Sequence, residues 1–208
     1  MACNVICISH ETGAEGEEVG RLVATALGFR YVDEEIVAAA ARDAGVETSR
    51  VASEEQRKTL AGRVLQHLEA GGADVAALGG AIPFRPGEWS EELRSFIRDA
   101  IAETASRGNV VIVAHAASFA VGRSASTLRV LVAATPETRS RRLSEQRGVT
   151  ASEASRNVRA ADAGRRDYLK RFYDVGRELP THYDLVINTD AIVPERAAEI
   201  VAHAARSA

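Results

Sequence analysis

A glycine-bearing turn near the start of the chain has the residue types and spacing of an anion site. It lies between an apolar run, Asn4 to Ser9, and a helical pattern that begins at Glu17. Backbone N–H groups of such a turn, at the N-terminus of a helix, can hold the oxygens of a phosphate. A tight strand-to-helix connection that needs glycine dihedrals is the alternative. The residues of the candidate cradle are Gly13, Ala14, Glu15, Gly16, Glu17 and Glu18.

The side chains of this turn differ from those of a loop built for a nucleoside triphosphate. Such a loop reads GxxxxGK[ST], in which the lysine adds a mobile charge and the hydroxyl holds magnesium. Here Gly16 and Glu17 occupy the lysine and hydroxyl positions, and the nearest lysine in sequence is Lys58. Glu17 and Glu18 each favour the dipole of the following helix by less than about 1 kcal/mol, but they oppose a bound phosphate. The backbone cradle is therefore predicted to form without the charges that make it bind tightly.

Composition narrows the class of protein. A chain of 208 residues fits a single domain, 1–208, that can bury a core without disulfides or a structural metal. The formal charge of −3 provides no overall basic field to recruit nucleic acid, although residues 139–177 are rich in arginine. The sequence has neither an apolar stretch long enough to cross a membrane nor a secretory signal. We expect a cytoplasmic protein with no nucleic-acid or membrane partner, and the oligomeric state, including a homodimer, stays open.

Two cysteines flank the first apolar run. In an extended strand, Cys3 and Cys7 lie on one face roughly 13 Å apart, which is too far for a mutual disulfide. We expect buried thiols. A metal site completed by His10 is the alternative, and the sequence offers it no fourth ligand.

Short apolar runs alternate with helical patterns along the chain, as in βα units that build a parallel sheet covered on both faces. We expect the first strand in the centre of the sheet and ligands at the carboxyl ends of the strands. The predicted strands are Asn4 to Ser9, Phe29 to Val32, Asn109 to Ala114, Leu128 to Ala134 and Tyr183 to Asn188.

Helices are predicted by apolar spacing and by their caps. The long polar helix from Ala151 to Asp174 is expected to be interrupted at Gly164. Asp33 is either the N-cap of a helix that ends near Gly45 or a ligand of the substrate. The other predicted helices run from Glu17 to Leu27, from Ser90 to Gly108, from the cap Thr135 with Pro136 as first residue, and from Pro194 onward.

Five segments, taken in order, resemble the cytidylate kinase-like family, a branch of the P-loop nucleoside monophosphate kinases. They read ISHETGAEGEEVGRLVATALGFRYVDEEIV, RGNVVIVAHAASFA, TPETRSRRLSEQRG, ADAGRRDYLKRFY and YDLVINTD. The resemblance implies an α/β P-loop NTPase three-layer sandwich, with about five parallel strands and helices on both faces. It also implies a core at 1–45 and 90–208, a helical monophosphate-binding insertion at about 46–89, and a lid at about 148–175.

The same resemblance implies an activity, the transfer of the γ-phosphoryl group of ATP to CMP or dCMP with Mg²⁺. It assigns phosphate-facing arginines to the start of the lid and to its second helix, where solvated helix-face charges are the alternative. It assigns nucleotide binding to the loop, and it implies no metal ligands from the protein. The implied catalytic residues are Arg139, Arg142, Asp162, Arg165 and Arg166, and the implied substrate-binding residues are His10, Asp33, His115 and Tyr168.

Three basic positions of the family have changed in this chain. The arginine that follows the glycines in GSGGRE is Glu17, the arginine of a GRG motif is His115, and the arginine before the loop is His10. At an effective dielectric constant of ~20, one unit charge ~4 Å from a phosphate changes the interaction energy by about 4 kcal/mol before screening. A catalytically inactive pseudokinase or nucleotide-binding regulatory protein is therefore the alternative function, and a kinase for another small acceptor is a third.

Overall fold

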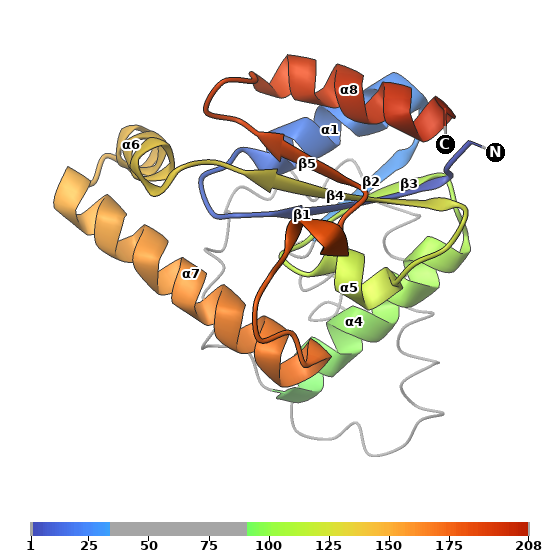
Figure 1. The fold of residues 1–208 in the computed structure, drawn as a ribbon, viewed down its shortest axis with the longest axis horizontal. Helices are drawn as coiled ribbons and strands as arrows, with labels where there is room; N and C mark the ends of the chain where they lie inside the picture. The colour runs from blue at the N-terminus through green and yellow to red at the C-terminus, as the bar shows by residue number, and fades with distance from the viewer. Residues whose placement is uncertain (1, 34–90, 208) are drawn as a thin grey trace.

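A parallel β-sheet runs through the middle of the molecule in the computed structural model (Figure 1). The structure describes residues 2–33 and 91–207, so the predicted insertion and the predicted helix after Asp33 lie outside the described residues. Within them, five strands form one sheet in the order β2-β3-β1-β4-β5, and every pairing is parallel. The prediction of five parallel strands with the first in the centre is confirmed.

The strands follow the apolar runs of the sequence. All six residues of β1 are buried, as expected for a central parallel strand that has helices on both faces. Its neighbour β3 is apolar throughout, and β4 is apolar apart from Thr127 and Arg129. Strand β1 pairs with β4 from Val5 to His10 and with β3 from Val5 to Ile8. The strands are β1 (Val5–His10), β2 (Arg30–Asp33), β3 (Val110–Val113), β4 (Thr127–Ala133) and β5 (Leu185–Asn188).

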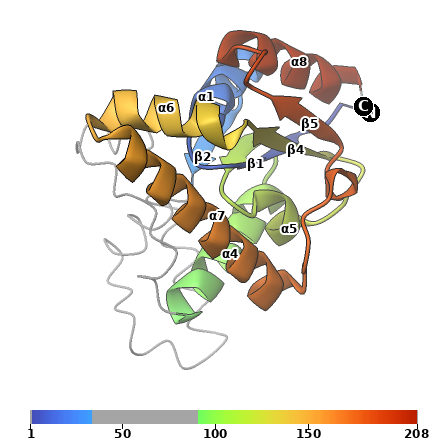
Figure 2. The ribbon, with the colours of Figure 1, turned by 60° about the vertical axis from the view of Figure 1, so that its left-hand side comes forward.

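Helices cover the two faces of the sheet. Helices α1 (Gly16–Leu27) and α8 (Pro194–Ser207) pack side by side on one face, and α4 (Glu91–Ser106) and α5 (Ala117–Val121) lie on the other (Figures 1 and 2). The predicted three-layer sandwich is therefore present. The short helix α5, which directly follows β3, was not predicted.

Helices α6 (Pro136–Arg147) and α7 (Ala151–Tyr173) pack against each other near the carboxyl ends of the strands (Figure 1). The side chain of Thr135 caps α6 as predicted, and Thr150 caps α7 in the same way. The predicted interruption at Gly164 is wrong, because α7 is one continuous helix. An interior glycine costs only about 1 kcal/mol relative to alanine, and contacts of its neighbours Asp162 and Arg165 hold the helix in place.

Both cysteines are free and buried, as the sequence predicts. Burial raises the pKa of the Cys7 thiol to about 12, so the thiol stays protonated at neutral pH. In residues 2–33 and 91–207, no group of three or more His, Cys, Asp or Glu side chains could hold a metal ion, so the alternative of a site with His10 has no support there. The described helices include none that is long and apolar enough to span a membrane.

Candidate functional site

The loop between β1 and α1 presents backbone amides toward the N-terminal end of the helix. Gly13 and Glu15 have positive φ angles of 82° and 64°, and α1 begins at Gly16. The amides of Gly13, Glu15 and Gly16 donate to no acceptor within the described part of the chain. A glutamate in the left-handed region is strained by about 1–3 kcal/mol, and such strain is concentrated at ligand sites. The loop therefore has the form of a phosphate cradle.

The carbonyl groups of the loop point the other way and are satisfied by side chains. Arg139 donates to the carbonyl oxygen of Thr12 at 3.4 Å, and Arg142 donates to that of Gly13 at 3.4 Å. The hydroxyl of Thr189, which follows β5, donates to the carbonyl oxygen of Ala14 at 3.0 Å. These bonds fix the orientation of the peptide planes, because each carbonyl that is held on one side turns its amide group to the other.

Arg139 lies under the loop and is 2% exposed. Its two terminal nitrogens donate to the two carboxylate oxygens of Asp162 at 2.8 Å each, and Nε donates to the carbonyl of Ala134 at 3.1 Å. Glu11 lies 3.5 Å from the same Nε. Burial raises the pKa of Glu11 above its ordinary value although Arg139 opposes this shift. The guanidinium that was predicted to face phosphates is thus engaged by two carboxylates of the chain itself.

Arg142 ties the loop to the turn after β5. It donates to the carbonyl and hydroxyl oxygens of Thr189 at 2.7 and 3.0 Å, and it pairs with Glu15 at 3.1 Å. Thr189 is 2% exposed and bonds to both the loop and Arg142. No pattern in the sequence indicates this role, because it depends on bringing the last strand next to the first loop.

Arg165 joins α7 to the ends of β1 and β3. Its guanidinium donates to Glu178 at 2.5 and 2.9 Å, to the carbonyl of His10 at 3.1 Å, and to the carbonyl of His115. The hydroxyl of Tyr183 donates to Glu178. Burial alone would raise the pKa of Glu178, but its bonds to Arg165 hold that pKa below its ordinary value. Neither Glu178 nor Tyr183 was among the predicted site residues.

His10 and His115 form a stacked pair beside the loop. Their ring centroids are 4.9 Å apart with an interplanar angle of 26°, and both residues are buried. The Nδ1 atom of His115 lies 3.2 Å from the carbonyl oxygen of His10. His10 Nε2 is 3.6 Å from the carboxylate of Glu17, so two of the altered family positions are paired with each other. Burial, His10 and Arg165 lower the pKa of His115 well below its ordinary value, and its ring stays neutral.

The remaining predicted residues lie farther from these contacts. Asp33 is the last residue of β2. The ring of Tyr168 packs against that of Phe172 in a tilted arrangement, with ring centroids 4.9 Å apart. Arg166 is exposed, and its guanidinium makes no ion pair within residues 2–33 and 91–207. The functional roles assigned to all of these residues stay predictions.

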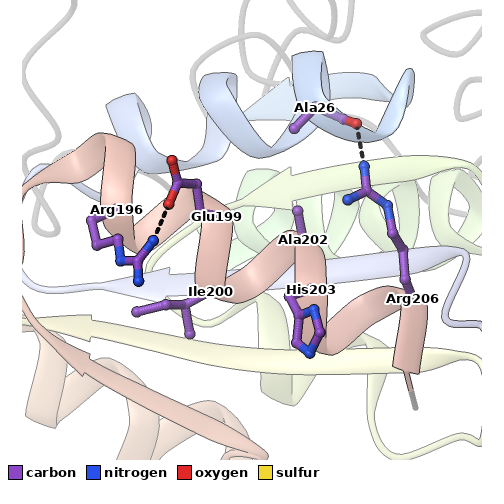
Figure 3. A pocket seen from close by; sticks show the side chains of 7 residues that line it. All are labelled: Ala26, Arg196, Glu199, Ile200, Ala202, His203 and Arg206. Carbon is purple, nitrogen blue, oxygen red and sulfur yellow. Dashed lines mark hydrogen bonds and ion pairs between the residues drawn. The ribbon is translucent and has the colours of Figure 1, made fainter.

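The structure also has a pocket of about 530 Å³ away from the loop, along α8 (Figure 3). Its charged groups are occupied, because Arg196 pairs with Glu199 at 2.5 Å and Arg206 donates to the carbonyl of Ala26 at 2.7 Å. The pocket therefore offers less polar chemistry than the loop. Its lining residues are Ala26, Arg196, Glu199, Ile200, Ala202, His203 and Arg206.

Comparison with known proteins gives one family and several similar folds. The model of the cytidylate kinase-like family matches residues 5–191. A structure from Eubacterium ventriosum, titled as an uncharacterized protein, has a TM-score of 0.64 at 15% identity, with 98% of this chain and 99% of that chain covered. No curated protein matches the sequence.

Two shikimate kinases have the same fold at a greater distance. The enzyme from Bacteroides thetaiotaomicron has a TM-score of 0.50 at 16% identity, with 98% of this chain and 96% of that chain covered. The enzyme from Acinetobacter baumannii, solved in complex with shikimate, has a TM-score of 0.51 at 14% identity, with 99% and 94% covered. At such identities the likeness shows the fold alone.

Proposed function

The chain belongs to the cytidylate kinase-like family, and from this premise we propose that it transfers the γ-phosphoryl group of ATP to CMP, dCMP or a related small acceptor. The phosphates of the donor bind the loop between β1 and α1. The observation that carries the proposal is the set of amides at Gly13, Glu15 and Gly16, which have no acceptor among the described residues. They begin the helix whose dipole favours an anion at that place.

Phosphoryl transfer at this site depends on which arginines are available to the phosphate. Transfer needs cations against the equatorial oxygens of the phosphoryl group. Arg139, Arg142 and Arg165 could supply them only by exchanging a carboxylate of the chain for a phosphate oxygen. Arg166 is exposed on the same helix as Arg165 and makes no such pair in the described part of the chain.

Members of this family generally use ATP and Mg²⁺. The loop of this chain suits the phosphates of ATP better than it suits the metal ion. The amides fit phosphate. The hydroxyl that holds magnesium in a phosphate loop is replaced by Glu17, whose carboxylate faces His10. We therefore assign no step to the metal ion.

A second function is favoured by the ion pairs themselves. Arg139 and Arg165 are almost fully buried, and each makes a two-point bond to a carboxylate. Breaking a buried pair by removing one partner costs about 3–5 kcal/mol. A protein that binds a nucleotide without transferring its phosphate would leave these pairs intact.

The two functions are separated by measuring turnover and binding on the full chain. A coupled assay of ADP release over the four nucleoside monophosphates is expected to show turnover with CMP, and calorimetric titration is expected to show ATP binding. Binding of ATP without turnover of any acceptor would support the second function. Absence of binding for every nucleotide at millimolar concentration would overturn both.

A charge reversal in the loop tests where the donor binds. Glu17→Arg removes a negative charge from the cradle and adds a positive one, so we expect ATP affinity to rise about tenfold, which is ~1.4 kcal/mol. Glu18→Arg is the matched control, because Glu18 is exposed on the next position of the helix and pairs with Arg21. Equal effects of the two substitutions would contradict the placing of the donor phosphates at the loop.

A further inference from the structure

The ring of His10 lies against Gly16, at the position where a phosphate loop carries its lysine. A Cβ atom added to Gly16 would lie 2.2 Å from His10 Cβ and 2.5 Å from His10 Cγ. No side chain can therefore begin at residue 16 while His10 keeps its place. The imidazole has taken the space next to the cradle that a lysine stem would need.

We propose that His10 is the basic group of the loop and binds a phosphate oxygen as an imidazolium, so that the loop takes up a proton together with its anion. This inference rests on the proposed binding of phosphate at the loop and specifies the group that neutralises it. The expected ligand is a phosphate-like dianion, and its affinity falls as the pH rises.

One nitrogen of the His10 ring lacks a partner. The residue is 5% exposed, and Nδ1 has no hydrogen-bond partner within the described residues. A buried polar atom without a partner costs about 1–3 kcal/mol. The unpartnered nitrogen distinguishes His10 from a histidine whose two ring nitrogens are both satisfied by the core.

Three arginines near the loop are already neutralised by carboxylates of the chain. Arg139 pairs with Asp162, Arg142 with Glu15 and Arg165 with Glu178, each at 3.1 Å or less. His10 has only the longer 3.6 Å contact with Glu17. It is therefore the basic side chain at the cradle that can gain a charge without first breaking a short ion pair.

The charged and titratable groups around His10 come from three neighbouring segments. The carboxylate of Glu17 on α1 favours the protonated ring. Arg165 of α7, which bonds to the carbonyl of His10, opposes protonation of the ring, and Glu178 offsets the charge of Arg165. His115, after β3, stacks on the ring, and its own low pKa keeps it neutral. On the β4 side the paired residue is the apolar Val132. An added dianion beside the ring favours its protonated form.

Sulfate is the probe for this proposal, because it stays a dianion over the whole range. We expect calorimetric titrations from about pH 5.5 to about pH 8.5 to show an affinity that falls by up to about tenfold per pH unit as the pH rises. In His10→Gln the sulfate affinity should not depend on pH, and at the acidic end of the range it should be about tenfold weaker than in the wild type. His203→Gln, which removes an exposed histidine of α8, is the matched control and should keep the wild-type profile. The same slope in His10→Gln as in the wild type would overturn the inference.

A measurement on the unaltered protein covers the case in which His10→Gln does not fold. Titration with sulfate at about pH 7.5, in two buffers of different ionisation enthalpy, counts the protons taken up on binding, and we expect up to about one. Sulfate binding without proton uptake would overturn the role of His10 and leave phosphate binding standing. No sulfate binding at any pH would overturn both.

Discussion

Arg165 was predicted to face a transferred phosphate, and the structure gives its guanidinium four acceptors within the chain. Its contacts join α7 to Glu178 and to the carbonyl groups of His10 and His115. A charged group that is this well satisfied stabilises the arrangement of α7 over the sheet. The stabilisation depends on the carboxylate, because without it the buried cation has no counter-ion.

Removing that carboxylate tests the pair. Glu178→Gln leaves Arg165 with an amide in place of an anion, and we expect the free energy of unfolding to fall by about 3–5 kcal/mol at pH 7 in urea titrations. Glu145→Gln is the control, because Glu145 pairs with Arg141 on an exposed helix face and should not change the stability measurably. A loss below about 1 kcal/mol would contradict a stabilising role for the pair.

The same pair predicts how stability depends on pH. The pKa of Glu178 is lower in the folded protein than its ordinary value of 4.5, so the folded state binds fewer protons there. Its contribution is complete above about pH 4.5 and is lost as the pH falls through the lowered pKa. In Glu178→Gln this part of the acid dependence should disappear. If the free energy of unfolding of Glu178→Gln depended on pH below about 4.5 as in the wild type, other groups would be responsible for the acid dependence.

At the scale of elements, α1 owes its close approach to the sheet to Gly20. A Cβ atom at this position would lie 2.4 Å from a methyl group of Val113 on β3. We expect Gly20→Ala to destabilise the fold by about 1–3 kcal/mol in thermal or urea denaturation, although alanine is the better helix former by ~1 kcal/mol.

Two further variants make this prediction specific. Adding Val113→Ala to Gly20→Ala should recover part of the loss, and a double-mutant cycle measures the coupling. Gly176→Ala is the control, because a Cβ atom there meets nothing within 4 Å. Additive effects of the Gly20 and Val113 substitutions would contradict the close contact.

The features that were predicted correctly from the sequence are those that a local pattern of residues determines. Apolar runs gave the strands, the glycine turn gave the loop, and Thr135 with Pro136 gave the start of α6. The features that were not predicted depend on contacts between segments that are far apart in the sequence. The pairing of Arg165 with Glu178 requires the chain to reverse after α7, and no spacing rule describes that reversal. The interruption expected at Gly164 was wrong because tertiary contacts on both sides outweigh a weak local preference.

For the whole molecule, α7 connects segments that are far apart in sequence. Asp162 holds Arg139 of α6 under the loop, and one turn later Arg165 bonds to the ends of β1 and β3. Opening of this helix would therefore free Arg139 under the loop and carry Arg165 away from the ends of β1 and β3. Such coupling between α7 and the loop requires the two ion pairs to break before or during ligand binding.

Asp162→Asn breaks the first of these pairs and tests the coupling. Arg139 loses a two-point bond to a carboxylate, so α7 should open more often, and amide hydrogen exchange over residues 151–173 should accelerate at least about tenfold while β1 and β4 stay protected. The freed guanidinium lies under the loop, so sulfate affinity should rise in the same variant. Asp167→Asn is the control, because Asp167 is exposed on the same helix and makes no ion pair in the described part of the chain. Faster exchange spread evenly over the sheet and α7 would indicate general destabilisation and contradict an opening of α7 alone.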